Sequence, residues 1–183
     1  MLPRLLGLTA LVLVLACNEP SDAPPPSVEP AVEPAPEPFE ALSEDELRSR
    51  IQNATRRARE EGKHVLLDFV ADWCTDCREV VRVSGLEPAR SLIEEDYVLV
   101  YVDVGDWNRH DQLRERYGIT RIATLVVLDG SGRRLAQTTL EPISNNVPLS
   151  PEALASWLRA PRDPAPSGGT PPTEPLFPAE LAH

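Results

Sequence analysis

The feature that most constrains the fold is a short apolar run leading directly into two cysteines. Residues 65–70 are apolar apart from Asp68 and rich in β-branched side chains, which is typical of a strand covered on both faces. Cys74 follows where a helix is expected to begin, and helical spacing places Cys77 about one turn further on. A thiol at a helix N-terminus lies near unpaired backbone N–H groups, which favour the nucleophilic thiolate. We therefore expect a redox-active dithiol in which Cys74 attacks a disulfide and Cys77 resolves the intermediate.

Elements before and after this stretch alternate between helix and strand. Ser43 and Glu46 form a capping-box pattern that predicts a helix, with Gly62 as its stop. Further helices are expected at 74–83, 89–94, 109–117 (capped by residues 106–108) and after Ser150, and further strands at 97–104, 124–128 and 133–139. This order predicts an α/β fold with a central mixed sheet of about four strands flanked by helices.

The two ends of the chain differ from its middle in composition. Residues 1–17 join a basic start to an apolar stretch too short to span a bilayer, as a bacterial signal peptide does. Their last residue, Cys17, ends a run that resembles a lipobox and predicts lipidation; a plain signal peptide with an incidental cysteine is the alternative. Most of the 20 prolines lie in residues 18–42 and 161–183, which we interpret as an extended linker and a disordered tail around one domain at 43–160.

Charge and cysteine content narrow the function classes. A net charge of −11 argues against a nucleic-acid partner. Besides Cys17, the only cysteines are the Cys74/Cys77 pair, so no structural disulfide partner is left over. A zinc site would need two more ligands, and the three histidines show no ligand spacing. We expect no metal and no cofactor other than the Cys74–Cys77 disulfide itself.

Residues 63–80 resemble the active-site segment of the thioredoxin superfamily. The sequence Leu-Asp-Phe-Val-Ala-Asp-Trp-Cys at 67–74 is similar to the active-site sequence in the C-terminal periplasmic domain of the transmembrane thiol:disulfide interchange reductase. It also resembles the tethered thioredoxin-like lipoproteins of bacterial envelopes. The resemblance covers roughly residues 43–160 and implies a thioredoxin-like fold. It also implies the roles already expected for Cys74 as nucleophile and Cys77 as resolving cysteine.

Two further residues take roles from the resemblance. Asp68 lies in an apolar strand, where a carboxyl group should have a raised pKa. In the family, the acid at this position assists proton transfer at the second cysteine; the alternative is a strand-end acid that reaches water. Trp73 corresponds to an aromatic cover over the active site, and its alternative is a partly buried core aromatic.

The pair between the cysteines, Thr75 and Asp76, should affect the redox poise. A carboxylate beside the sulfur disfavours the thiolate, so Asp76 and Asp72 favour a reductant over a disulfide donor. Alternatively, Asp76 only complements the helix dipole, as acids often do in a first turn.

One loop departs from the family pattern. The family has a cis-proline loop that binds substrate backbone, usually Gly-Ile-Pro-Thr, and the matching residues here are Arg121, Ile122, Ala123 and Thr124. A cis bond before a non-proline residue costs ~2.5–4 kcal/mol, which favours a trans bond before Ala123; a cis bond, as in the family, is the alternative that the sequence leaves open. By resemblance, Ile122, Ala123 and Thr124 should line the site. Two hypotheses follow: the lost ring opens the sulfurs to a metal ion, and Arg121 stabilises the thiolate.

Together these features favour a lipid-anchored, periplasm-facing thiol:disulfide oxidoreductase of the bacterial cell envelope. Its expected partners are exported proteins with thiols or disulfides, and a membrane reductase or other electron donor, because envelope compartments are oxidising. An alternative is a copper-type metal-handling module that uses Cys74 and Cys77 as thiolate ligands. A third interpretation is a catalytically idle thioredoxin-like interaction domain.

Overall fold

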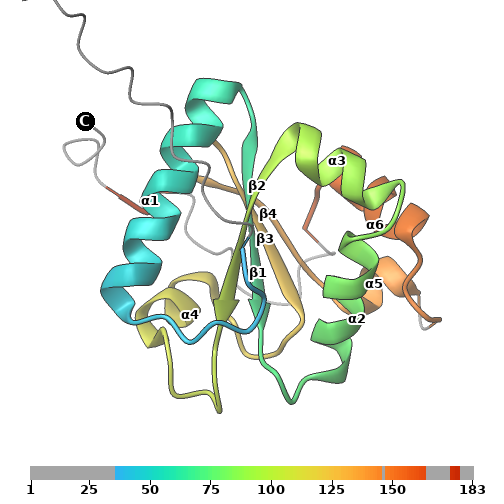
Figure 1. Ribbon diagram of the computed structural model, residues 1–183, viewed down its shortest axis with the longest axis horizontal. Coiled ribbons are helices and arrows are strands. Elements are labelled where there is room, and N and C mark those ends of the chain that lie inside the picture. Colours follow the sequence, from blue (N-terminus) through green and yellow to red (C-terminus); the bar gives the residue numbers. More distant parts are fainter. Residues whose placement is uncertain (1–35, 146, 164–173, 178–183) are drawn as a thin grey trace, which may run out of the picture. The chain divides into compact units, whose positions relative to one another are not determined.

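The computed structural model describes residues 36–145, 147–163 and 174–177. Its centre is a four-stranded sheet in the order β2-β1-β3-β4 (Figure 1). The strands are β1 (His64–Val70), β2 (Tyr97–Asp103), β3 (Thr124–Leu128) and β4 (Arg134–Thr139). Strand β1 pairs in parallel with β2 and antiparallel with β3, and β3 pairs antiparallel with β4. The predicted mixed sheet with antiparallel pairing is confirmed.

Burial along the strands explains why β1 lies in the interior of the sheet. Every residue of β1 after His64 is buried, and so is all of β3. Strand β4 instead alternates between buried and more exposed positions, as expected for an edge strand with one solvated face. The strand that leads into the cysteines is therefore held on both sides by neighbouring strands, which fixes the point where it ends.

Helices cover both faces of the sheet. Figure 1 shows α1 and α4 on one side, with α2, α3, α5 and α6 on the other. The helices are α1 (Glu44–Glu61), α2 (Thr75–Ser84), α3 (Ala89–Asp96), α4 (Asp111–Tyr117), α5 (Leu140–Ser144) and α6 (Pro151–Arg159). The short helix α5 was not predicted from the sequence.

The ends of α1 and α6 follow their sequence signals. Ser43 and Glu46 form the predicted capping box, and Gly62 closes α1 in the left-handed conformation at φ 70°. Ser150 caps α6, with its side chain accepting a hydrogen bond from the Ala153 N–H. These local signals therefore locate both ends of α1 and the start of α6.

The start of α4 differs from the prediction. The helix begins at Asp111 rather than Arg109, and the residue before it, His110, gives no side-chain cap. The cap expected from residues 106–108 is wrong because the Asn108 side chain bonds within the loop, where its Oδ1 accepts from the Asp106 N–H at 3.2 Å. Residues 104–110 thus form an ordered loop between β2 and α4.

Part of the C-terminal segment packs on the domain. The N–H of Leu176 donates to the Gly132 carbonyl at 3.0 Å, and Arg116 donates to the carbonyls of Glu174 and Pro175 at 2.7 and 2.9 Å. Leu176 and its neighbour in sequence, a phenylalanine, are partly buried and line a groove together with α1 and α4. Two apolar side chains of the expected tail thus contact the domain, and a disordered tail over 161–183 stays a prediction.

The expected signal peptide and almost all of the linker lie outside the described residues. Within the described part of the chain, no helix has the length and hydropathy required to cross a bilayer. Lipidation at Cys17 and the extended linker remain predictions.

Candidate active site

The two cysteines form a disulfide at the N-terminus of α2. Cys74 is the N-cap residue, and its Sγ accepts a hydrogen bond from the Cys77 N–H at 3.0 Å. Cys74 is 5% exposed and Cys77 is fully buried, so Cys74 is the sulfur that a partner can reach. In the reduced state the same N–H and the helix N-terminus favour a thiolate on Cys74.

Asp68 lies in β1, the strand that leads into the disulfide, and does not reach water. It is 1% exposed, and its Oδ1 has no hydrogen-bond partner among the described residues. Burial raises the pKa of Asp68 to about 8. The Cys77 Sγ lies 3.9 Å from the carbonyl oxygen of Phe69, the residue after Asp68 in the strand. The resolving cysteine thus contacts the backbone of the strand that carries the buried acid.

Sequence reasoning missed Tyr101, which stands opposite Asp68 on the neighbouring strand. The parallel register of β1 and β2 aligns the two residues, so their side chains share one face of the sheet. Burial and the nearby Asp68 carboxyl group raise the pKa of Tyr101. Only the register of the strands reveals this neighbour, because the two residues are far apart in sequence.

Trp73 lies at the surface beside Cys74, which argues against the core aromatic considered as its alternative. Its residue is 47% exposed, and its indole Nε1 donates to the Gly105 carbonyl at 2.9 Å. A second indole, that of Trp107, lies with its ring centroid 6.4 Å away. Trp107 was not recognised from the sequence, since nothing local relates it to the cysteines.

Thr75 and Asp76 occupy the first turn of α2, and both are exposed. A cation that the sequence analysis overlooked, Arg78, reaches back over this turn. Its guanidinium contacts the Asp72 carbonyl oxygen and lies 3.4 Å from the Thr75 hydroxyl. The acidic surroundings of the disulfide therefore include one basic side chain.

The loop before β3 has the isomer that the intrinsic preference of the bond disfavours. The Ile122–Ala123 peptide bond is cis, the alternative that the sequence left open. The prediction considered only the intrinsic preference of the bond, whereas in the fold Ala123 is buried and the Thr124 hydroxyl donates to the Arg121 carbonyl at 2.8 Å. The guanidinium of Arg121 lies 3.8 Å from the Glu141 carboxylate of α5, which gives it a partner other than the sulfurs.

No group of three or more His, Cys, Asp or Glu side chains has a metal-binding arrangement within the described ranges.

The comparisons with known proteins agree with the fold and the motif. Residues 51–140 match a family model described as "Thioredoxin-like domain". The chain is 30% identical over 87 residues to the thiol:disulfide interchange protein DsbD of Ralstonia nicotianae, and 31% over 81 residues to that of Salmonella typhi. These alignments cover 47% and 44% of this chain but only 14% of each relative, so the chain spans a small part of their length.

Two solved structures share the fold. A disulphide isomerase from Xylella fastidiosa superposes with a TM-score of 0.58 at 24% identity, covering 66% of this chain and 95% of that one. The oxidised C-terminal domain of Neisseria meningitidis DsbD gives a TM-score of 0.51 at 19% identity, covering 67% of this chain and all of that domain.

Proposed function

The chain contains a thioredoxin-like domain of the thiol:disulfide oxidoreductase type. We propose that this domain reduces disulfides of exported proteins in a bacterial envelope. The observation that carries the proposal is the Cys74–Cys77 disulfide at the N-terminus of α2, in which Cys77 contacts the strand that carries the buried Asp68. The acids Asp72 and Asp76 near the disulfide support the reducing direction, because negative charge disfavours the thiolate form of the reduced pair.

The first step is attack by the Cys74 thiolate on one sulfur of a substrate disulfide. A bond forms between Cys74 Sγ and that sulfur, the substrate S–S bond breaks, and one substrate thiolate leaves. The Cys77 N–H, 3.0 Å from Cys74 Sγ in the oxidised protein, supports the negative charge before attack. Cys74 is suited to this step because it is the less buried of the two sulfurs.

The second step resolves the mixed disulfide. The Cys77 thiol gives its proton to the Asp68 carboxylate and attacks Cys74 Sγ, so the Cys74–Cys77 disulfide forms and the second substrate thiolate leaves and takes up a proton. Two electrons have then passed from the dithiol to the substrate. A pKa of about 8 lets Asp68 accept and return a proton near neutral pH.

Continued turnover needs a second partner. The oxidised pair must receive two electrons from a partner dithiol, such as that of a membrane reductase, because envelope compartments are oxidising. We propose that lipidated Cys17 and the proline-rich residues 18–42 hold the domain near such a partner. At ~3.1 Å per residue in the polyproline form, this linker can reach on the order of 80 Å.

The deciding measurement is the reduction potential of the purified protein, equilibrated in glutathione buffers and followed by intrinsic fluorescence. A value near about −270 mV supports the reductase, whereas one near about −120 mV would instead indicate a disulfide donor. The control is the variant Cys74→Ser, which should show no redox transition and no reduction of insulin.

Anchoring is tested separately by cell fractionation. The wild-type chain should sediment with membranes, and Cys17→Ala should not. An equal distribution of both proteins would refute the lipid anchor without affecting the redox proposal.

A further inference from the structure

The loop between β2 and α4 lies beside the exposed indole next to the disulfide. The Gly105 carbonyl accepts the Trp73 Nε1–H at 2.9 Å, and the rings of Trp73 and Trp107 are tilted by 46° with centroids 6.4 Å apart. Trp107 is half-buried, whereas Trp73 remains 47% exposed. Two indoles, one from the residue before Cys74 and one from the loop between β2 and α4, thus lie close to each other beside the disulfide.

The backbone of this loop has an unusual conformation. Gly105, Trp107 and His110 have φ values of 54°, 62° and 56°. At Gly105 a side chain would collide with the Asn108 Oδ1, since an added Cβ would lie 2.5 Å away. A positive φ at a residue as bulky as tryptophan is rare, and it persists only where the surroundings hold it.

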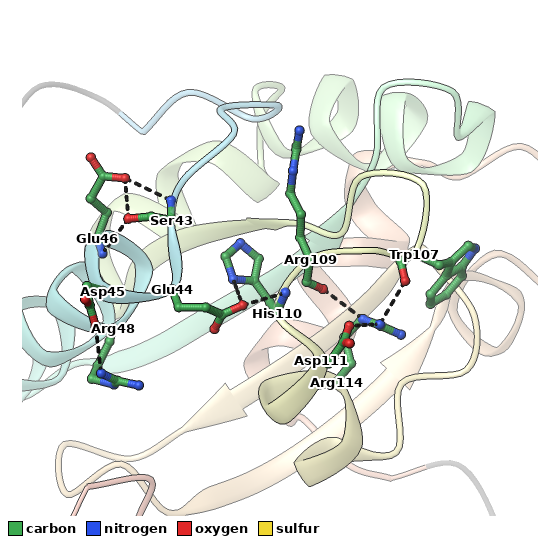
Figure 2. A network of polar contacts seen from close by, with 10 residues as sticks. All are labelled: Ser43, Glu44, Asp45, Glu46, Arg48, Trp107, Arg109, His110, Asp111 and Arg114. Carbon is green, nitrogen blue, oxygen red and sulfur yellow. Dashed lines mark hydrogen bonds and ion pairs between the residues drawn. The ribbon is translucent and has the colours of Figure 1, made fainter.

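The first support of the loop is Arg114 in α4. Its guanidinium donates to the carbonyls of Trp107 and Arg109, each at 3.0 Å, and its central carbon lies 5.4 Å from the centroid of the Trp107 ring (Figure 2). A cation over an indole face adds to the hydrogen bonds. Contacts with Arg114 therefore fix the position of the Trp107 ring.

The second support comes from the start of α1. Glu44 Oε1 accepts the His110 N–H at 2.8 Å and lies 3.1 Å from His110 Nδ1, as Figure 2 shows. The capping box at Ser43 holds the turn from which Glu44 projects. Contacts from α1 and α4 thus hold Trp107 in place in the oxidised protein.

We propose that Trp107, together with Trp73, binds the side chain next to the reacting cysteine of the substrate and selects apolar side chains there. A polypeptide joined to Cys74 must pass beside Trp73, the preceding residue. Because the Trp73 N–H is already bound to Gly105, that indole offers mainly ring carbons to an occupant. A polar side chain would lose water there without gaining a partner, whereas an aromatic or aliphatic one packs on the rings. This inference rests on the proposed reductase function.

The test compares two peptide disulfides of equal length and charge that differ in the residue preceding the cysteine, phenylalanine or serine. Each is a mixed disulfide with glutathione, and the reduced full-length protein is the reductant. Second-order rate constants from stopped-flow measurements should favour the phenylalanine peptide by roughly fivefold. The variant Trp107→Gly tolerates the positive φ and removes the ring, so its ratio should fall to about one.

Three controls separate recognition from folding. Trp107→Phe should restore most of the preference, and Trp107→Asn, which also tolerates a positive φ, should reproduce the glycine result. Leu135→Ala removes a similarly exposed apolar side chain on β4, 44% exposed, and should leave the ratio unchanged. The rate of each protein with 2-hydroxyethyl disulfide, which has no flanking residue, measures the reactivity of its dithiol, and the peptide rates are divided by it before the ratios are compared.

The possible failures are distinguishable. If the wild type reduces 2-hydroxyethyl disulfide but shows the same peptide ratio as Trp107→Gly, the recognition proposal is refuted while the reductase stands. If the wild type reduces no disulfide, the proposed function fails, and this inference fails with it.

Discussion

Replacing the buried acid Asp68 by asparagine should change the stability of the protein in opposite directions at low and high pH. The ordinary pKa of this carboxyl group is 3.8, and burial raises it to about 8 in the fold. The folded state therefore holds a proton that the unfolded chain releases. Consequently, the contribution of Asp68 to stability is greatest below pH 3.8 and is lost as the pH rises to about 8.

The size of the effect follows from the gap between the two pKa values. At ~1.36 kcal/mol per pH unit, a shift from 3.8 to about 8 corresponds to on the order of 5 kcal/mol. Asparagine does not titrate, so Asp68→Asn lacks this loss entirely. Its buried amide adds a cost of ~1–3 kcal/mol that is the same at every pH. The variant should therefore be slightly less stable than the wild type at pH 4 and more stable by a few kcal/mol at pH 8.

The assay is urea unfolding of the oxidised protein at pH 4, 6 and 8, with the difference between variant and wild type taken at each pH. Asp45→Asn is the matched control, since it replaces a carboxyl group whose side chain is 90% exposed and should change stability by less than about 1 kcal/mol at each pH. Parallel stability curves for Asp68→Asn and the wild type would refute the raised pKa. The same substitution removes the proton acceptor for Cys77, so resolution of the mixed disulfide should slow by at least about 100-fold in single-turnover measurements.

Three further outcomes are expected. Cys77→Ser should accumulate a covalent mixed disulfide at Cys74, seen by mass spectrometry, and its failure to do so would contradict the assigned order of attack. Burial lowers the pKa of His110 more than Glu44 raises it, so this site favours folding above about pH 6.5 and should lose that contribution as the pH falls. His110→Gln should flatten the stability profile between pH 7 and 5, and an unchanged slope there would argue against the neutral imidazole. Leu176→Ala should lower the free energy of unfolding by about 1 kcal/mol, because the side chain is partly buried in the α1–α4 groove; urea unfolding with an unchanged midpoint would show that the segment contributes nothing.

The parts of the fold that could be predicted are those with local causes. The short, β-branched apolar run before Cys74 is typical of a covered strand, and the capping box at Ser43 indicates the helix start from four adjacent residues. The burial of Asp68 follows in the same way, because its neighbours in the strand are apolar. Local pattern therefore yields the disulfide, the acid beside it and the elements that carry them.

The parts that could not be predicted depend on contacts between distant segments. Tyr101 reaches Asp68 only through the register of two parallel strands, and Trp107 meets Trp73 only when the loop after β2 folds back. Polar residues such as Asn108 suit both a helix cap and a turn, so sequence alone does not distinguish them. The cis bond before Ala123 likewise depends on the folded surroundings and not on the local sequence.

The packing of residues 174–177 moves the boundary of the folded unit beyond its last helix. A recombinant fragment ending near Arg159, where α6 ends, would leave out the two apolar residues that line the groove together with α1 and α4. Apolar side chains of that groove, among them Leu47, Ile51 and Leu113, would then face solvent more fully. Enlarged apolar patches promote self-association. Such a shortened fragment should tend to aggregate at high concentration even though every helix and strand is present.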